Sequence, residues 1–316
     1  RLRAGYQPGI DVGVTETLIR RTTEQIAVMR YYRIGREDNR RLVARNGDTA
    51  YDLTGVKPSL THFSDLCVAA DVTDQSIDSV ASRLLESADR IALEDLRESG
   101  KPVVPDEVMA AGVTYRISEQ ARQSESGMPE VYIDVYEGER PELFFKATPN
   151  RTVGPDEAVG IRSDSTWDVP EPELGVVLYR GEIVGYTIGN DMSSRSIEGE
   201  NPLYLPQAKM YDKCCSIGPC VVSTDEIDKP HDLEIGMRIE RDGETLFDDT
   251  TSTSKMVRSC EELVSYYVRH NSPADVAVLL TGTSLVPDDD FTLREGDRIT
   301  IDIEDIGTLT NDVVSV

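Results

Sequence analysis

Three acidic residues, Glu171, Glu173 and Asp191, are spaced so that they could hold one metal ion. Glu171-Pro172-Glu173 leads into an apolar run over 174–179 that is typical of a buried strand. On an extended backbone, residues i and i+2 face the same side, and Pro172 stiffens the approach. Converging carboxylates repel one another unless a cation neutralises them. Hard ions such as Mg²⁺, Mn²⁺ or Ca²⁺ prefer such oxygen ligands.

Asp191 joins this pair if two consecutive strands form a hairpin. It follows an apolar run over 183–188, and Arg180-Gly181 separates this run from the strand after Glu173. Antiparallel pairing through that turn would bring all three acids to one edge of a sheet. The alternative is that they are ordinary surface charge, because a chain with 58 acidic residues produces such spacings by chance.

The first hundred residues mix helical and strand patterns. Asn46-Gly47 is typical of a tight hairpin turn, and apolar residues recur at helical spacing over 73–98. The Pro-rich stretch 101–105 interrupts the pattern, so we expect an N-terminal α/β domain over 1–104 and a catalytic domain over 105–316. The elements expected before the boundary are a helix over 14–28, a strand over 31–34, a hairpin over 42–52 and one or two helices over 73–98.

Strand patterns dominate after this boundary. Glycine or proline separates many of the apolar runs, and 260–270 is the only clear helix. The expected fold class is therefore α+β, mainly β, with a rolled or sandwiched mixed sheet. The strands expected here cover 174–179, 183–188, 220–223, 233–241, 276–280 and 298–303.

The charge balance restricts the possible partners and surroundings. The chain has 58 acidic and 33 basic residues, a net charge of -25, and the acids are dispersed. Such a surface suits a halophilic protein, because salt screens its self-repulsion. No basic stripe favours nucleic acid, and no apolar run approaches the roughly 18 residues that a membrane span needs. The chain starts without a signal pattern, so we expect a cytoplasmic protein.

The cysteines and histidines predict no further metal or nucleophile site. The five cysteines form no CxxC pair, so free thiols are expected. The three histidines lie far apart in the sequence, and none adjoins a cluster of cysteines.

Several ordered motifs together resemble the fumarylacetoacetate hydrolase family, from about Val108 to the C-terminus. The resemblance implies a β-rich roll, a homo-oligomer such as a dimer or tetramer, and a divalent metal held by Glu171, Glu173 and Asp191. The motifs are Glu142–Lys146 (ELFFK), 153–155 (VGP), 171–174 (EPEL), 185–195 (GYTIGNDMSSR), 207–209 (QAK), 217–219 (IGP) and 281–283 (TGT).

A narrower resemblance is to the 2-keto-3-deoxy-pentonate dehydratase branch of this family. It is carried by 140–151 (RPELFFKATPNR), 162–165 (RSDS) and 200–207 (ENPLYLPQ). This branch converts 2-keto-3-deoxy-D-arabinonate to 2,5-dioxopentanoate. The D-xylose route converges on the same compound, so the resemblance does not say which pentose supplies it.

The matching motifs also suggest residue roles. They make Glu142 and Lys209 the candidate proton-transfer groups, with the assignment of base and acid left open. Thr283 is a candidate for binding the substrate carboxylate, although its Thr-Gly-Thr turn could equally be a plain strand end. Glu142 could instead pair with Arg140, and Lys209 could only hold the substrate or a metal ligand. The further substrate-binding candidates are Tyr115, Glu198 and Gln207.

One departure from the hydrolase pattern favours dehydration over hydrolysis. Ser118 stands where family hydrolases usually carry a histidine that helps to activate water, and serine is a poor general base near neutral pH. Two alternatives stay open. The chain could hydrolyse acylpyruvates or decarboxylate oxaloacetate, or it could be a catalytically silent metal-binding scaffold or sensor.

Overall fold

The computed structural model describes residues 29–35, 39–116 and 129–316. The helix expected over 14–28 and the substituted position Ser118 lie outside the described residues. No described helix is long and apolar enough to cross a membrane.

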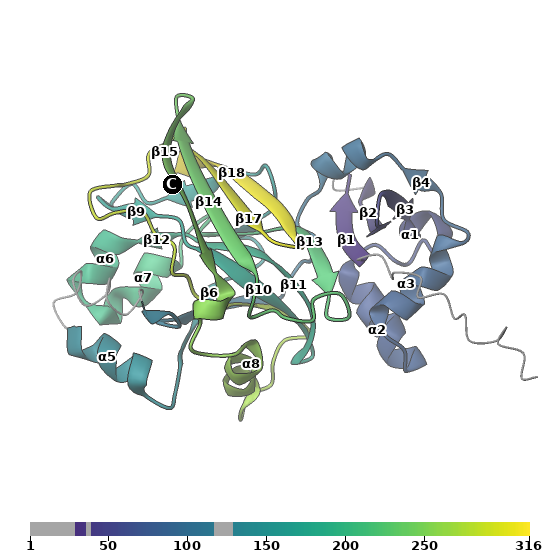
Figure 1. Cartoon of the computed structure of the whole chain (residues 1–316), viewed down its shortest axis with the longest axis horizontal. Helices are drawn as coiled ribbons and strands as arrows, with labels where there is room; N and C mark the ends of the chain where they lie inside the picture. Colours follow the sequence, from purple (N-terminus) through teal and green to yellow (C-terminus); the bar gives the residue numbers. More distant parts are fainter. Residues whose placement is uncertain (1–28, 36–38, 117–128) are drawn as a thin grey trace, which may run out of the picture.

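Two β-sheets form the centre of the molecule, as expected for a mainly β fold (Figure 1). The larger sheet has the order β4-β3-β2-β1-β13-β11-β10-β16-β5-β6, and β7 pairs with β13. Its strands after residue 105 are β5 (Glu107–Gly112), β6 (Glu142–Ala147), β7 (Thr152–Val153), β10 (Pro172–Tyr179), β11 (Glu182–Asp191), β13 (Cys215–Ser223) and β16 (Val276–Leu280).

The second sheet covers one side of the larger one and is amphipathic. In β17, Ile299, Ile301 and Ile303 are buried while Arg298 and Asp302 are exposed, so alternate residues face the core and the solvent. Its order is β15-β14-β17-β18-β8. These strands are β8 (Val159–Ile161), β14 (Glu234–Arg241), β15 (Glu244–Ser252), β17 (Arg298–Ile303) and β18 (Gly307–Ser315), and a separate small sheet pairs β9 (Asp168–Val169) with β12 (Ser193–Ser194).

The N-terminal elements extend the large sheet rather than forming a separate one. β1 pairs with β13, with Arg30 opposite Val222, so the first strands continue the sheet that carries the acids. The elements are β1 (Met29–Ile34), β2 (Arg41–Asn46), β3 (Thr49–Asp52), α1 (Leu53–Val56), α2 (Phe63–Thr73), α3 (Ile77–Leu85), β4 (Arg90–Ile91) and the 3₁₀ helix η2 (Leu93–Glu98).

The structure confirms most of the expected strands and corrects the helices. The hairpin over 42–52 is present as β2 and β3, with Asn46 opposite Thr49. The one or two helices expected over 73–98 are present as α3 and η2, whereas α2, which ends at Thr73, was not expected. Its buried residues Phe63, Leu66, Cys67 and Ala70 have a helical spacing that the sequence reading overlooked.

The expectation of a single clear helix after residue 105 is wrong. Besides α8 (Cys260–Val268), the structure has α5 (Pro129–Glu137), α6 (Arg195–Glu200), α7 (Leu205–Lys209) and the 3₁₀ helices η3 (Pro202–Tyr204) and η4 (Thr253–Lys255). Of these, α6 and α7 have six and five residues, too few for a periodic apolar pattern to be recognised.

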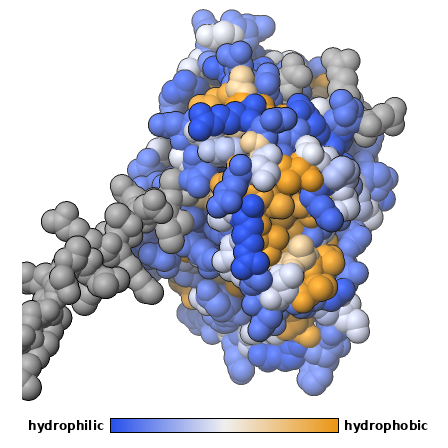
Figure 2. Space-filling view, turned by 90° about the vertical axis from the view of Figure 1, so that its right-hand side faces the viewer, coloured by the Kyte–Doolittle hydropathy of each residue, from blue (hydrophilic) through white to orange (hydrophobic). Residues whose placement is uncertain are grey.

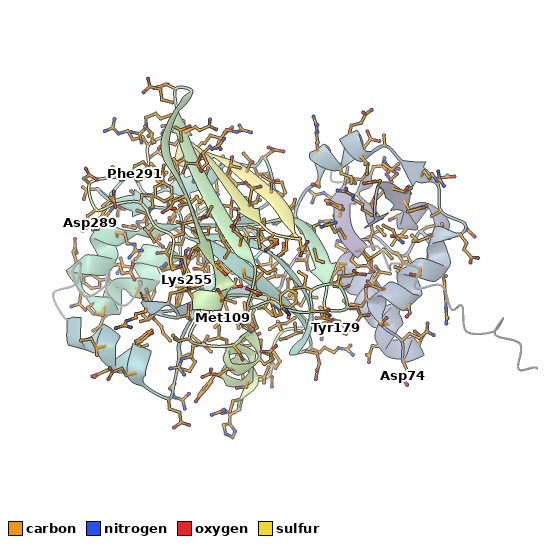
Figure 3. All side chains as sticks on the ribbon, in the orientation of Figure 1. Asp74, Met109, Tyr179, Lys255, Asp289 and Phe291 are labelled. Carbon is orange, nitrogen blue, oxygen red and sulfur yellow. The ribbon has the colours of Figure 1, made fainter. Side chains whose placement is uncertain are left out.

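A buried network joins the N-terminal elements to β13. Tyr31 of β1 and Ser223 of β13 both donate to the Asp78 carboxylate of α3, at 2.5 and 2.6 Å. The Tyr31 ring packs against Phe63, with 5.3 Å between ring centroids. Burial raises the pKa of the Asp78 carboxyl group, while its two hydrogen bonds lower it. Beside this network, Tyr179 lies where the large sheet meets α2 (Figure 3), and Arg180 pairs with Asp71.

The outer face of the N-terminal elements is mostly hydrophilic, in line with the acidic composition. Figure 2 shows hydrophilic residues over most of this side, with a smaller hydrophobic area between them. Elsewhere the apolar residues fill the core, and all five cysteines are buried free thiols, as expected.

We predict that Asp78→Ala lowers the free energy of unfolding by about 2–4 kcal/mol, because it leaves two buried hydroxyl donors without an acceptor. Urea unfolding at fixed high salt measures the loss, and Asp228→Ala at an exposed position is the control. Adding Tyr31→Phe to Asp78→Ala should restore part of the stability. No restoration would mean that the unpaired Tyr31 hydroxyl is not the cause.

Candidate metal centre and active site

The β10–β11 hairpin brings the three acids together at one edge of the large sheet. Arg180 and Gly181 form its turn with positive φ angles of 50° and 84°. Pro172 lies opposite Asn190 and Glu173 opposite Gly189, and the Asp191 amide donates to the Glu171 carbonyl at 2.9 Å. The predicted antiparallel pairing is therefore confirmed. Asp191 is the last residue of β11 rather than lying just beyond it.

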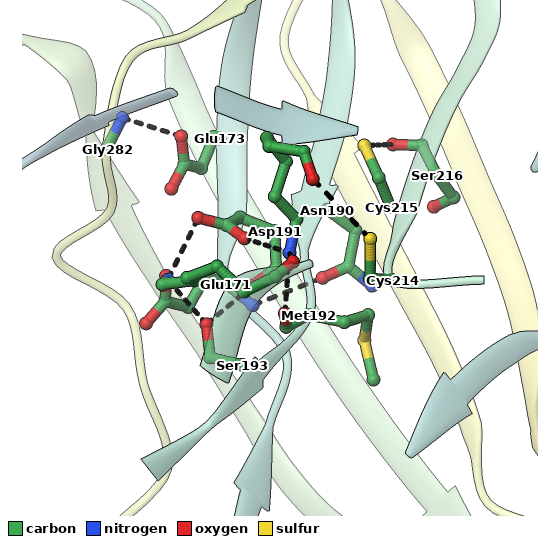
Figure 4. Close-up of polar contacts among 12 residues, drawn as sticks. Glu171, Glu173, Asn190, Asp191, Met192, Ser193, Cys214, Cys215, Ser216 and Gly282 are labelled. Carbon is green, nitrogen blue, oxygen red and sulfur yellow. Dashed lines mark hydrogen bonds and ion pairs between the residues drawn. The ribbon is translucent and has the colours of Figure 1, made fainter. Parts of the chain in front are cut away.

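The three side chains are buried and point toward one another (Figure 4). Each offers a carboxylate oxygen, and these oxygens lie within 4.8 Å of one another. Burial raises the pKa of Glu173 well above its usual value, and the charges of Asp191 and Glu171 raise it further. The backbone amide of Gly282 partly offsets this by donating to Glu173 Oε2 at 2.6 Å. The like-charge crowding expected from the sequence is present.

Two cations hold the Glu171 and Asp191 carboxylates in place. Lys209, at the end of α7, donates to Glu171 Oε2 at 2.5 Å, to Asp191 Oδ2 at 2.9 Å and to Ser193 Oγ at 2.5 Å. Arg195, at the start of α6, donates to Glu171 Oε1 at 2.8 Å. Because both cations are buried, these bonds fix the carboxylates in a low-dielectric setting where they are strong.

A third cation, Lys146 of β6, supports this arrangement from behind. It is fully buried and lies 2.6 Å from Asp191 Oδ1. It also donates to the backbone carbonyls of Met192 and Lys209, at 2.7 and 2.6 Å. One ammonium group thus ties a ligand carboxylate to the backbone that carries Lys209. The three ligand carboxylates face three buried cations, so the cluster has no net formal charge.

The acids form the floor of a cavity of about 200 Å³. A cavity of this volume suits a small molecule. After β16, the chain from Gly282 to Asp289 forms one wall, and Asp289 is labelled in Figure 3. The predicted site residues that line the cavity are Glu142, Glu171, Glu173, Asp191, Glu198, Lys209 and Thr283.

Glu142 reaches this cavity because its neighbour on β5 is a glycine. Gly112 lies opposite Glu142 in the sheet, and a β-carbon on Gly112 would lie 2.0 Å from Glu142 Oε2. No side chain fits there unless the carboxylate moves. Arg140, the alternative partner considered for Glu142, has its guanidinium group 5.5 Å from the centre of the Tyr266 ring.

The other candidates differ in position. Tyr115 is completely buried beside Glu173. Burial and, after it, the negative charge of Glu173 raise the pKa of Tyr115. Tyr115 does not line the cavity. Gln207 is exposed on α7, and its carbonyl accepts from Arg162 at 3.3 Å. Thr283 lines the cavity, and its hydroxyl accepts from the Leu285 amide at 3.1 Å, as in a turn.

Sequence reasoning missed the supporting roles of Lys146, Arg195 and Gly112. One signal was available for Lys146. Lys146 follows Glu142 and Phe144 at alternate positions of an otherwise apolar strand, and a lysine in such a strand indicates a buried ion pair. The same alternation places the Phe144 ring 5.6 Å from Lys209 Nζ.

The donor set fits a hard divalent cation. All three candidate ligands are carboxylates, their oxygens are close enough to share one ion, and no thiol or imidazole belongs to the described cluster. Oxygen-only sites suit Mg²⁺, Mn²⁺ and Ca²⁺ rather than softer metals. Glu171, Glu173 and Asp191 would hold the ion, leaving the open side of the cavity for substrate.

Comparisons with known proteins agree with this geometry. Residues 107–314 match the family model described as fumarylacetoacetate (FAA) hydrolase C-terminal. The chain is 59% identical over 290 residues to a probable 2-keto-3-deoxyxylonate dehydratase of Haloferax volcanii. The aligned region covers 91% of this chain and all of the Haloferax protein. It is 46% identical over 227 residues to the 2-dehydro-3-deoxy-D-arabinonate dehydratase of Saccharolobus solfataricus, covering 70% of this chain and 76% of that protein.

A solved structure gives the same result for the fold. A 2-keto-3-deoxy-D-arabinonate dehydratase complexed with magnesium and 2,5-dioxopentanoate matches with a TM-score of 0.78 and 35% identity, over 91% of this chain and 99% of the other. The match to the family model and the identity to the Haloferax protein both extend over most of the chain. This chain therefore belongs to the fumarylacetoacetate hydrolase family.

Proposed function

We propose that this protein is a magnesium-dependent hydro-lyase that converts a 2-keto-3-deoxy-D-pentonate (arabinonate or xylonate) to 2,5-dioxopentanoate. The observation that carries the proposal is the buried cluster of Glu171, Glu173 and Asp191 with Lys209 in a small cavity that Glu142 also lines. The dehydratase relatives, one of them solved with magnesium and 2,5-dioxopentanoate, support the same reaction class.

The reaction removes one molecule of water and needs two proton-transfer groups. A proton leaves C3, the C4 hydroxyl departs with a second proton, and a C3–C4 double bond forms. Loss of a C5 proton and protonation of C3 move the double bond to C4–C5, and the resulting enol becomes the aldehyde. A magnesium ion bound to the three carboxylates would polarise the C2 carbonyl and stabilise negative charge on its oxygen.

The contacts of Lys209 suggest how the two groups divide this work. Its Nζ donates to Glu171, Asp191 and Ser193, which requires the protonated ammonium form. An ammonium can give a proton to the departing hydroxyl but cannot accept one. Glu142, which lines the same cavity, is then the group that takes the C3 proton.

The remaining lining residues would orient the substrate. Thr283 lines the cavity wall next to Gly282, whose amide donates to Glu173. In our proposal the Thr283 hydroxyl would bind the C1 carboxylate of the substrate. Glu198, buried on α6, would accept a hydrogen bond from a substrate hydroxyl. Tyr115 and Gln207 are not among the lining residues and receive no role in substrate contact.

We further propose residues 105–316 as the catalytic domain and 1–104 as a supporting domain whose strands extend the same sheet. The dispersed net charge of -25 favours work in a cytoplasm of high salt, and the Haloferax relative supports this. We also propose that the protein forms a homo-oligomer, such as a dimer or tetramer.

We predict that purified protein at high salt with Mg²⁺ forms an aldehyde from 2-keto-3-deoxy-D-pentonate but releases no pyruvate from acylpyruvates or oxaloacetate. Excess chelator should abolish the reaction, and Mg²⁺ should restore it. A coupled aldehyde dehydrogenase assay measures the product. Release of pyruvate and an organic acid from an acylpyruvate would show a hydrolase instead, and no turnover of any substrate would favour the scaffold or sensor alternative.

We predict that Glu142→Gln and Lys209→Met each lower kcat by at least about 10²-fold, the usual contribution of one proton-transfer group. The variants should differ in solvent exchange. In D₂O, NMR should show that Glu142→Gln incorporates no deuterium at C3 of the substrate. Lys209→Met should still exchange the C3 proton for deuterium but should not eliminate water from the substrate. The reverse pattern would exchange the two roles.

We predict that Lys146→Met weakens Mg²⁺ binding by about 10–100-fold, the usual effect of losing a group that orients a metal ligand. The reason is that Asp191 loses its ion pair with the Lys146 ammonium group, and the Lys209 backbone carbonyl loses the hydrogen bond from the same group. Calorimetric Mg²⁺ titration measures the affinity apart from turnover, and exposed Lys229→Met is the control. Unchanged Mg²⁺ affinity in folded Lys146→Met would contradict a positioning role.

A further inference from the structure

Three cations gather at the seam between the N-terminal elements and the catalytic part of the chain, away from the proposed active site. Arg33 lies on β1, Arg40 immediately before β2, and Lys101 in the connection that leads to β5. The Gly100 amide donates to the Arg33 carbonyl at 2.8 Å, and a β-carbon on Gly100 would lie 3.4 Å from Arg40 Nη1. Gly100 thus brings the three residues into one neighbourhood.

The positive charges of these residues act on one another. Burial and, to a smaller extent, the charge of Arg40 lower the pKa of Arg33 to about 10, while the charge of Asp65 acts in the opposite direction. Burial also lowers the pKa of Lys101, where Glu157 acts in the opposite direction and Arg40 and Arg33 add to the lowering. Like charges are therefore held together in a chain that has 25 more acidic than basic residues.

No carboxylate within the described residues forms an ion pair with Arg33, Arg40 or Lys101. The two nearest acids already have other partners. Asp65 accepts from the Thr61 and His62 amides at 2.8 and 2.9 Å, and Glu157 accepts from the Gly154 amide at 2.7 Å.

The partners that these cations do have are neutral. Arg33 Nη2 donates to His62 Nε2 at 3.0 Å, which requires an uncharged imidazole. Lys101 donates to the carbonyls of Pro149 and Thr152 at 2.8 and 2.7 Å. The Nε groups of Arg33 and Arg40 are buried without any hydrogen-bond partner, and Arg33 as a whole is only 8% exposed. Buried, charged donors of this kind are costly unless an acceptor reaches them.

We propose that Arg33, Arg40 and Lys101 bind one compact inorganic anion, such as chloride, which holds the N-terminal elements against the catalytic part of the chain. The anion supplies the hydrogen-bond acceptor that the Nε groups of Arg33 and Arg40 lack among the described residues, and it adds negative charge to that of Asp65 and Glu157 nearby. An anion that binds only the folded state stabilises that state by mass action. The stability of the folded chain therefore depends on which anion is present and not only on ionic strength.

The test measures the thermal unfolding midpoint of the full chain while potassium chloride replaces potassium glutamate at constant total potassium. The wild-type midpoint should rise by about 2–4 °C and then level off as the chloride concentration increases. This is the shift that one weakly bound ligand gives a chain of this size. Arg40→Gln should lose this saturable rise. In glutamate alone it should unfold at the same midpoint as the wild type or a higher one, because a crowded charge has been removed.

Arg90→Gln is the matched control, since Arg90 carries the same charge on an exposed strand of the same region. It should keep the full chloride response. A potassium phosphate series distinguishes phosphate from chloride as the preferred compact anion. Parallel chloride responses in the wild type and Arg40→Gln would overturn the proposal.

Crystals grown in potassium bromide give a second, independent measurement. We expect an anomalous peak among the Arg33, Arg40 and Lys101 side chains in the wild type. Its absence in well-ordered crystals would also overturn the proposal, whatever the unfolding data show.

Discussion

The site depends on the repulsion among three buried carboxylates and on the groups that contain it. Glu171, Glu173 and Asp191 bring their oxygens within 4.8 Å of one another with almost no exposure to water. Such crowding is tolerable only because Lys209, Arg195 and Lys146 supply matching positive charge. The balance makes the cluster neutral before any ligand enters. A divalent ion would add two positive charges, which suits a substrate that brings a carboxylate and develops an enolate.

The large sheet makes this arrangement rigid. β10 and β11 are central strands paired on both sides, so the hairpin that carries the three acids cannot shift without breaking two ladders. Lys146 extends the rigidity to α7, because its ammonium binds Asp191 and the Lys209 carbonyl together. Glu142 and Lys209 are thereby held on the walls of one cavity by separate elements. The proton transfer that we propose at adjacent carbons requires such preorganisation.

The acidic surface and the cationic seam are two responses to the same charge balance. Exposed acids repel one another weakly in strong salt, because screening acts over a few ångströms. Arg33 is buried and Arg40 and Lys101 are partly buried, so salt screens their charges less and they need a partner at atomic distance. Their crowding would be out of place in a chain with so many acids if salt supplied no anion. The seam thus gives salt a structural role besides screening.

The sequence alone determined which three carboxylates come together and where most strands lie, because these depend on local pattern. Glu171, Glu173 and Asp191 lie on two strands joined by a two-residue turn, so alternation and turn chemistry brought them together. Tertiary structure decided which residues support them. Lys146 meets the Lys209 carbonyl across 63 residues, and Gly282 meets Glu173 across 109. The pairing of β1 with β13, which joins the N-terminal strands to the sheet that carries the acids, is more distant still, because Arg30 and Val222 are 192 residues apart. Such contacts arise from the packing of remote segments, and no local spacing encodes them.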